Sequence, residues 1–295
     1  MTGDVPLRTA YPLQRCKNIY LIRHGQGFHN LAGDKDLAAY LSPKYLDASL
    51  TSHGFDQAAA LRDHLKSNGI ASSVQLVVVS PLTRTLQTAV GVFGGDVILN
   101  GNSTETALMI DGVGEYKHKA VSSVGAPPFV AVEWCREQMG LHPCDQRHPI
   151  STYRSLFPAI DFSDVVTDED TWWNATARES RDELVARCEN FVQWLLKREE
   201  TEIAVVSHSS FLKHLIGIFG DDCSSKLHLG PQKYFENCEM RSIVLVDKRP
   251  EEESKVPRKD FPGGIPPDVI NTTPLQSRPS RHHHHFFHHH STEPV

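Results

Sequence analysis

Short apolar runs alternate along this chain with longer stretches in which apolar residues recur every three or four positions. Residues 19–22 (Ile-Tyr-Leu-Ile) form such a run and predict a strand that is buried on both faces. Phe55, Ala58 and Leu65 fall on one face of a helix predicted over residues 53–66. Further runs predict strands over residues 74–79, 129–132, 203–206 and 242–246.

Two more helices have recognisable starts. Ser80 fits an N-cap and Pro81 fits the first helical position, so a helix is predicted from there through Val90. Ser180 and Glu183 have the spacing of a capping box, and apolar residues at helical spacing follow them. A shorter helix is predicted over residues 211–219.

The order of these elements predicts an α/β fold, a three-layer sandwich with a mostly parallel, twisted sheet and helices on both faces. Residues 92–178 show little periodicity and are interpreted as an inserted cap region over the site. Residues 17–248 then form one domain, which follows an N-terminal extension of residues 1–16. Residues 249–295 are rich in Pro and, near their end, in His, and they are predicted to be a disordered tail.

The composition of the chain mainly excludes classes of function. The net charge of −6 argues against a nucleic-acid binder, which needs a basic surface, but it allows a small basic pocket for one anion. No apolar run approaches the roughly 20 residues that span a bilayer, and the N-terminus lacks the apolar core of a signal peptide. We therefore expect a cytoplasmic protein with no membrane partner. The cysteines lack Cys-x-x-Cys spacing, which favours free thiols over a zinc or disulfide framework.

Cationic and histidine side chains follow three of the predicted strands. The first strand leads into Arg23 and His24, the second is followed one helical turn later by Arg84, and the strand over residues 203–206 leads into His208. Since the carboxyl ends of parallel strands share one edge of a sheet, these side chains are expected to converge there.

Such a set of side chains suits a phosphoryl group. Arginine offers planar, bidentate donors to phosphate oxygens, and a neutral imidazole can attack phosphorus and hold the phosphoryl group covalently. The chain has no Gly-x4-Gly-Lys-Ser/Thr loop and no evident cluster of aspartates for Mg²⁺. We therefore expect no metal site and no cofactor.

Four segments of the chain carry a family resemblance. Leu21 to Asn30, with Arg-His-Gly at its centre, closely resembles the signature of the histidine phosphatase superfamily in its phosphoglycerate-mutase-like branch. Three further segments match that family's motifs in the same order, over roughly residues 17–247: Leu-Thr-x-x-Gly-x-x-Gln from Leu50, Ser-Pro-Leu-x-Arg-Thr from Ser80, and Val-Ser-His-Ser from Val206. The chain most resembles the plant and fungal members, in which Cys-Arg-Glu and His-Pro-Cys-Asp segments also occur.

The resemblance implies a role for each residue of the convergent set. His24 is implied as the nucleophile that becomes phosphohistidine, and His208 as a second catalytic histidine. Arg23 and Arg84, together with His208, would cradle the phosphoryl group. Asn30 lies where the family places a polar phosphate contact.

The proton donor of the family is a glutamate, and two candidates compete for that role. Glu137, in Cys-Arg-Glu, fits better, and Glu133, directly after the predicted strand over residues 129–132, is the alternative. Gly27 stands where mutases often carry a small hydroxyl residue, so one phosphate contact is expected to be absent.

Three functions remain open at this level. The first is a metal-independent phosphatase of small phosphomonoesters such as sugar phosphates, with a small phosphorylated metabolite as its partner. The second is a phosphoglycerate-type mutase, and the third is a non-catalytic module that binds phosphorylated ligands. The sequence does not indicate the oligomeric state.

Overall fold

A computed structural model describes residues 7–99, 106–220 and 233–264 of the chain. The chain divides into two units, Met1–Arg258 and Lys259–Val295, and all the helices and strands of the described residues belong to the first. The tail prediction falls mostly on residues 265–295, which lie outside the described residues.

The first unit is built on a five-stranded sheet in the order β5-β2-β6-β1-β7. The strands are β1 (Cys16–Arg23), β2 (Leu76–Val79), β5 (Phe129–Ala131), β6 (Glu202–Ser207) and β7 (Met240–Val246). β1, β6, β2 and β5 run parallel to one another, and β7 pairs antiparallel with β1 at one edge. The predicted strands and the mostly parallel sheet are therefore confirmed.

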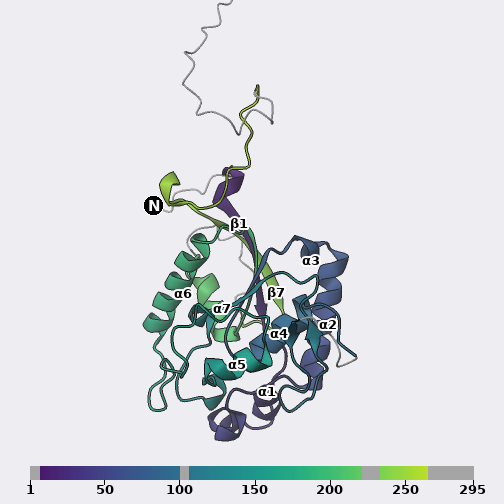
Figure 1. The fold of residues 1–295 in the computed structure, drawn as a ribbon. Helices are drawn as coiled ribbons and strands as arrows, with labels where there is room; N and C mark the ends of the chain where they lie inside the picture. The colour runs from purple at the N-terminus through teal and green to yellow at the C-terminus, as the bar shows by residue number, and fades with distance from the viewer. Residues whose placement is uncertain (1–6, 100–105, 221–232, 265–295) are drawn as a thin grey trace, which may run out of the picture. The chain divides into compact units, whose positions relative to one another are not determined.

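Helices cover both faces of this sheet. Alternate side chains of each strand point to opposite faces, so Tyr20 and Ile22 join one apolar core while Ile19 and Leu21 join the other. The first core is completed by α2 (Ser52–Ser67) and α4 (Thr83–Phe93), and the second by α6 (Arg181–Leu196) and α7 (Ser209–Gly217). Figure 1 shows these two pairs of helices on opposite sides of β1 and β7, which confirms the three-layer sandwich. The shorter helices are α1 (Phe28–Gly33), α3 (Ile70–Ser73) and α5 (Ile150–Leu156).

One predicted helix start is confirmed and one is wrong. Ser180 and Glu183 form the reciprocal capping box at the start of α6. The helix predicted from Ser80 begins instead at Thr83, after an N-cap residue that forms no side-chain cap. The Asp47 carboxylate takes over the capping, because it accepts hydrogen bonds from the Thr83 N–H at 2.8 Å and the Thr83 hydroxyl at 2.6 Å.

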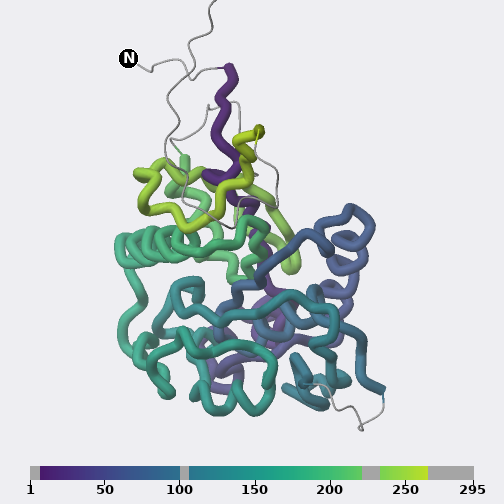
Figure 2. The backbone as a smooth tube through the Cα atoms, turned by 45° about the horizontal axis from the view of Figure 1, so that its top comes forward, coloured from purple at the N-terminus to yellow at the C-terminus, as the bar shows by residue number. Residues whose placement is uncertain are grey.

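The stretch interpreted as an insertion contains more regular structure than its weak periodicity predicts. Besides the predicted strand β5, it holds α5 and a small two-stranded sheet of β3 (Ala107–Met109) and β4 (Val121–Ser122). Figure 2 shows most of this stretch in teal, below the green helix α6. Its role as a cap stays a prediction. In the part of the chain that the structure describes, no helix has both the length and the apolar character needed to cross a bilayer.

Candidate active site

The sheet brings the predicted site residues to one edge. β6 lies between β1 and β2, so the residues that follow these strands, His24, His208 and Ser80, are neighbours. The centroids of the His24 and His208 rings lie 5.3 Å apart. The Arg84 Nε is 3.3 Å from the His24 Nε2, so α4 brings its arginine to the same spot.

His24 is held in a form that can act as a nucleophile. Its ring is buried, and its Nδ1 lies 2.6 Å from the Gly25 carbonyl oxygen, so we assign the proton to Nδ1. The lone pair then lies on Nε2, which accepts the hydrogen bond from Arg84. Burial, followed by the charges of Arg84 and Arg23, holds the pKa of His24 well below its ordinary value. The imidazole is therefore neutral at physiological pH.

Arg84 is fixed by two further bonds at the end of its side chain. Its Nη1 donates to the Cys144 carbonyl oxygen at 2.6 Å, and its Nη2 donates to the Asp145 carboxylate at 2.8 Å. Both members of this ion pair are almost completely buried. A charged hydrogen bond in such surroundings keeps the guanidinium in one orientation, with Nε facing His24.

His208 and Arg23 each present an atom that no described residue satisfies. The His208 Nε2 lies 2.8 Å from the Ser80 hydroxyl, while its Nδ1 is buried with no partner among the described residues. Arg23 donates from Nη1 to the Phe235 carbonyl oxygen at 2.6 Å. Its Nε is buried and has no hydrogen-bond partner among the described residues. Burial and the Arg84 charge hold the pKa of His208 well below its ordinary value, so this ring is neutral as well.

Asn30 lies at the start of α1 and supports the loop after His24. Its side-chain oxygen accepts a hydrogen bond from the Gly27 N–H at 3.0 Å. The amide nitrogen is the donor that Asn30 could still offer to a phosphoryl group.

The two candidate proton donors lie in different surroundings. Glu133 is buried between Arg136 and Arg147, at 2.9 and 3.0 Å, so both of its oxygens are used in ion pairs. The Glu137 carboxylate sits instead at the N-terminus of α7, where it accepts hydrogen bonds from the Ser210 and Phe211 N–H groups. Burial and the Asp145 charge raise the pKa of Glu137, against the effect of those hydrogen bonds. His208 is the N-cap residue of α7, so these bonds bring Glu137 to the same end of the sheet as His208.

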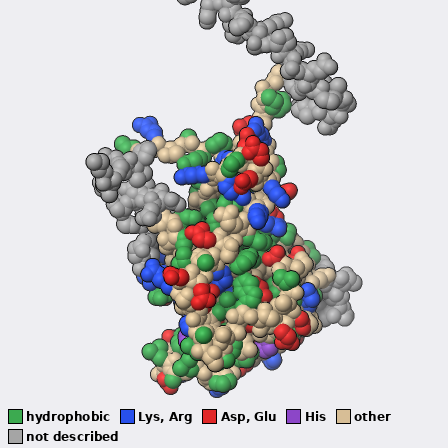
Figure 3. Space-filling model, turned by 90° about the vertical axis from the view of Figure 1, so that its left-hand side faces the viewer, with side chains coloured by type: hydrophobic (Ala, Val, Ile, Leu, Met, Phe, Trp, Pro, Cys, Tyr) green, Lys and Arg blue, Asp and Glu red, His purple; other side chains and the backbone are tan. Residues whose placement is uncertain are grey.

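The positive charge of the site is local rather than part of a basic surface. Figure 3 shows acidic and basic side chains interspersed on the side of the molecule that carries α6 and α7. The charge that faces His24 comes instead from Arg23 and the buried Arg84. An acidic protein can therefore still hold one anion, as the sequence predicts.

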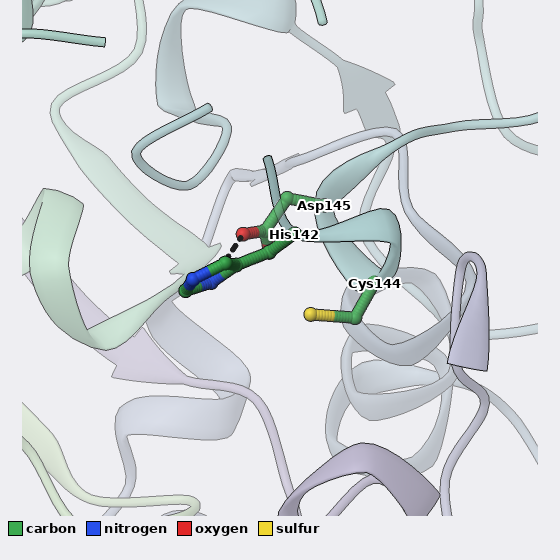
Figure 4. Close-up of side chains that lie close together, drawn as sticks. All are labelled: His142, Cys144 and Asp145. Carbon is green, nitrogen blue, oxygen red and sulfur yellow. Dashed lines mark ion pairs between the residues drawn. The ribbon is translucent and has the colours of Figure 1, made fainter. Parts of the chain in front are cut away.

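A histidine, a cysteine and an aspartate lie together beside Arg84. Potential ligand atoms of His142, Cys144 and Asp145 all lie within 4.8 Å of one another (Figure 4). However, the Asp145 carboxylate already pairs with Arg84, and its other oxygen lies 3.4 Å from the Arg178 guanidinium. Burial also raises the pKa of the Cys144 thiol, which opposes the thiolate that a metal requires. We interpret this cluster as one that orients the side chains of Arg84 and Arg178, rather than as a metal site.

Sequence reasoning missed two residues of the site. Asp145, the partner of Arg84, belongs to the His-Pro-Cys-Asp segment, which carried the family resemblance without an assigned role. His29 lies inside the Arg-His-Gly segment, and its buried ring is 5.7 Å from that of His24, centroid to centroid. His29 is the second residue of α1, and no sequence pattern there separates a site histidine from a core residue.

Comparisons with known proteins show which family the chain resembles. A family model described as the histidine phosphatase superfamily (branch 1) matches residues 19–98 and 161–254. A phosphoglycerate mutase-like protein of Arabidopsis thaliana is 47% identical over 261 residues, which cover 88% of this chain and 96% of that protein. Phosphoglycerate mutase-like protein 1 of the same plant is 46% identical over 260 residues, covering 88% and 91%. Among solved structures, the ecdysone phosphate phosphatase of Bombix mori in complex with tungstate matches at a TM-score of 0.47 and 16% identity. The match covers 77% of this chain and 88% of that one.

Proposed function

This chain belongs to branch 1 of the histidine phosphatase superfamily, and on that basis we propose that it hydrolyses small phosphomonoesters through a phosphohistidine on His24. Sugar phosphates and related carbohydrate metabolites are the substrate class we favour. The observation that carries the proposal is the state of His24: a buried, neutral imidazole whose Nδ1 is held by a carbonyl and whose Nε2 faces Arg84.

In the first step the His24 Nε2 lone pair attacks phosphorus, and the bond from phosphorus to the ester oxygen breaks. Arg23 and Arg84 would stabilise the negative charge on the non-bridging oxygens, together with His208 and the Asn30 amide. Glu137 would give its proton to the departing alkoxide, which leaves phosphohistidine and a free alcohol.

In the second step a water molecule attacks phosphorus and passes a proton to the Glu137 carboxylate. The bond between phosphorus and Nε2 breaks, so inorganic phosphate leaves and His24 returns to its neutral state. The raised pKa of Glu137 supports this role, because the acid must carry its proton at the working pH.

A mutase is the second candidate, and the names of the plant relatives favour it. Its first step would be the same, but an alcohol rather than water would take the phosphoryl group from His24. Hydrolysis and transfer are separated by adding an acceptor alcohol and asking whether a new phosphate ester forms at the expense of inorganic phosphate.

The test of the proposal is the release of inorganic phosphate from a panel of phosphomonoesters, in the presence of EDTA. The wild-type chain should turn over, and His24→Ala should lose activity by about 10⁴-fold or more, as expected for a nucleophile. His64→Ala is the matched control, since His64 is exposed on α2. Acid-labile, base-stable phosphate should appear on the peptide that contains His24.

Two results would count against the proposal. Label on His208 with none on His24 would reverse the two roles. Activity that disappears in EDTA and returns with Mg²⁺ would show that the arginines and histidines are insufficient without a metal.

A further inference from the structure

Three buried polar atoms near His24 lack a hydrogen-bond partner among the described residues. They are the Arg23 Nε, the His208 Nδ1 and the His29 Nδ1. Buried polar groups are normally paired, so each such atom calls for a partner that the protein itself does not supply. Arg23 and His208 already have a proposed role, whereas His29 has none.

His29 lies in surroundings that suit an anion. Its side chain is 3% exposed, and its ring centroid is 5.7 Å from that of His24. Burial comes first among the causes that hold the pKa of His29 well below its ordinary value, followed by the charges of Arg84 and Arg23. A neutral imidazole beside two guanidinium groups can still donate one N–H to a negatively charged oxygen.

Gly27 makes room for this ring. A Cβ added to Gly27 would lie 2.5 Å from the His29 Nδ1 and 2.6 Å from its Cε1, closer than real contacts allow. The Nδ1 edge of His29 therefore fills the space that a side chain at residue 27 would occupy. The contact that Gly27 cannot make is available from the imidazole two residues later.

A second interlocking pair fixes the other side of the ring. Tyr40 packs edge-on against His29, with centroids 6.0 Å apart and planes at 86°. Tyr40 in turn needs Gly33, since a Cβ there would lie 2.3 Å from its ring. The His29 ring is thus packed between the Gly27 backbone and the Tyr40 ring, which suits a preorganised donor.

We propose that His29 is a further substrate-binding residue, whose Nδ1–H donates a hydrogen bond to a non-bridging oxygen of the phosphoryl group. The proposal rests on the phosphoryl-transfer function proposed above. It assigns this chain a third histidine at the phosphoryl group, in the position that a short side chain at residue 27 would otherwise take.

The experiment uses the full chain and two readouts. One is the calorimetric affinity for inorganic phosphate, and the other is kcat/KM on an aryl phosphate, which needs little help from a proton donor. Loss of one charged hydrogen bond should weaken phosphate binding in His29→Ala by about 10–100-fold. His64→Ala should leave both values unchanged.

Two conservative variants locate the donor atom. The amide nitrogen of Asn can take the place of the imidazole Nδ1, and that of Gln the place of Nε2. His29→Asn should therefore keep most of the phosphate affinity, and His29→Gln should lose it. Equal affinities in the two variants, or a better one for Gln, would overturn the assignment to Nδ1.

Residue 27 gives an independent test by relocating the donor. Gly27→Ser alone should be damaging, because its Cβ meets the His29 ring, whereas Gly27→Ser combined with His29→Ala should bind phosphate better than either single variant. Gly217→Ser is the matched control, since a Cβ there meets nothing within 4 Å. A double variant no better than the worse single one would refute the relocation.

The outcome also separates this inference from the proposed function. A wild-type chain that binds phosphate and turns over, with His29 variants that match it, defeats the role of His29 alone. A wild-type chain that neither binds phosphate nor hydrolyses esters defeats both.

Discussion

Two buried groups of ionisable residues lie side by side in this protein, and they differ in how their polar atoms are paired. We call the first the phosphoryl site, made of Arg23, His24, His29, Arg84, His208 and Glu137. The second is the carboxylate cluster, in which Glu133 and Asp170 pair with Arg136 and Arg147.

In the carboxylate cluster both guanidinium groups pair with a carboxylate, although the Arg136 Nε has no partner among the described residues. Both terminal nitrogens of Arg136 donate to carboxylate oxygens at 2.7 to 2.9 Å. Arg147 donates to four backbone carbonyl oxygens in addition to its bonds with Glu133. In the phosphoryl site, atoms of Arg23 and His208 are left without a protein partner among the described residues. The difference teaches that burial of charge alone does not indicate function. The useful sign is several unpaired atoms around one histidine, here those of Arg23, His29 and His208, rather than a single one such as the Arg136 Nε.

The largest expected effect on activity comes from Glu137→Gln, a substitution in the phosphoryl site. Gln keeps the size of the side chain and removes the proton, so kcat/KM on an alkyl phosphate such as glycerol phosphate should fall by about 10²–10⁴-fold. An aryl phosphate has a good leaving group and should be affected far less. Steady-state kinetics on both substrates provides the check. A similar loss on both substrates would mean that Glu137 acts on the phosphoryl group rather than on the leaving group.

Glu133→Gln should give the opposite result. The change leaves Arg147 and Arg136 without a carboxylate that both contact, and breaking a buried pair in this way costs about 3–5 kcal/mol of stability. The ratio of alkyl to aryl turnover should stay at the wild-type value for the folded fraction. Denaturant unfolding measures the first effect. Selective loss of alkyl turnover in Glu133→Gln would transfer the proton donor to that residue.

Asp145 contacts both groups, so replacing it tests which of the two depends on its charge. Its carboxylate pairs with Arg84, while its backbone carbonyl accepts from Arg136 at 2.9 Å. In Asp145→Asn we expect kcat/KM to fall about 10–100-fold on alkyl and aryl esters alike, since one charged hydrogen bond that orients Arg84 is weakened.

The pH profile separates this positioning role from a general loss of structure. Asp145 contributes to the raised pKa of Glu137, so removing its charge should lower that pKa. Turnover of an alkyl ester falls as pH rises through the pKa of Glu137, and this alkaline fall should move to lower pH in Asp145→Asn. An unmoved alkaline limb with reduced stability would reduce Asp145 to a structural residue.

The sequence was sufficient for the sheet because its strands are continuous apolar runs that end in recognisable chemistry. It failed at the start of α4, where Asp47, distant in sequence, supplies the cap that Ser80 was expected to give. It also left Glu133 and Glu137 as alternatives, since only tertiary contacts show which one is enclosed by arginines. Both glutamates, and Asp145, lie outside the two segments, 19–98 and 161–254, that the family model matches.

The smallest expected effect concerns the stability of the phosphoryl site itself. The pKa values of His24, His29 and His208 are all held well below the ordinary 6.5, first of all by burial. As the pH falls through 6.5, these histidines become protonated in the unfolded chain but stay neutral in the folded chain. The free energy of unfolding therefore decreases as the pH decreases. Each ring contributes up to about 1.4 kcal/mol per pH unit.

His148 works in the opposite direction, because its hydrogen bond to Asp47 raises its pKa and adds stability at low pH that is lost as pH rises. Urea unfolding between about pH 7.5 and about pH 5.5 should therefore show a net loss of stability, since three rings outweigh one. His29→Asn should remove about a third of what the three rings contribute, and therefore more than a third of the net slope. His148→Asn should steepen the slope. A slope that His29→Asn leaves unchanged would mean that this ring takes up its proton in the folded protein, and would place it outside the group of histidines kept neutral around His24.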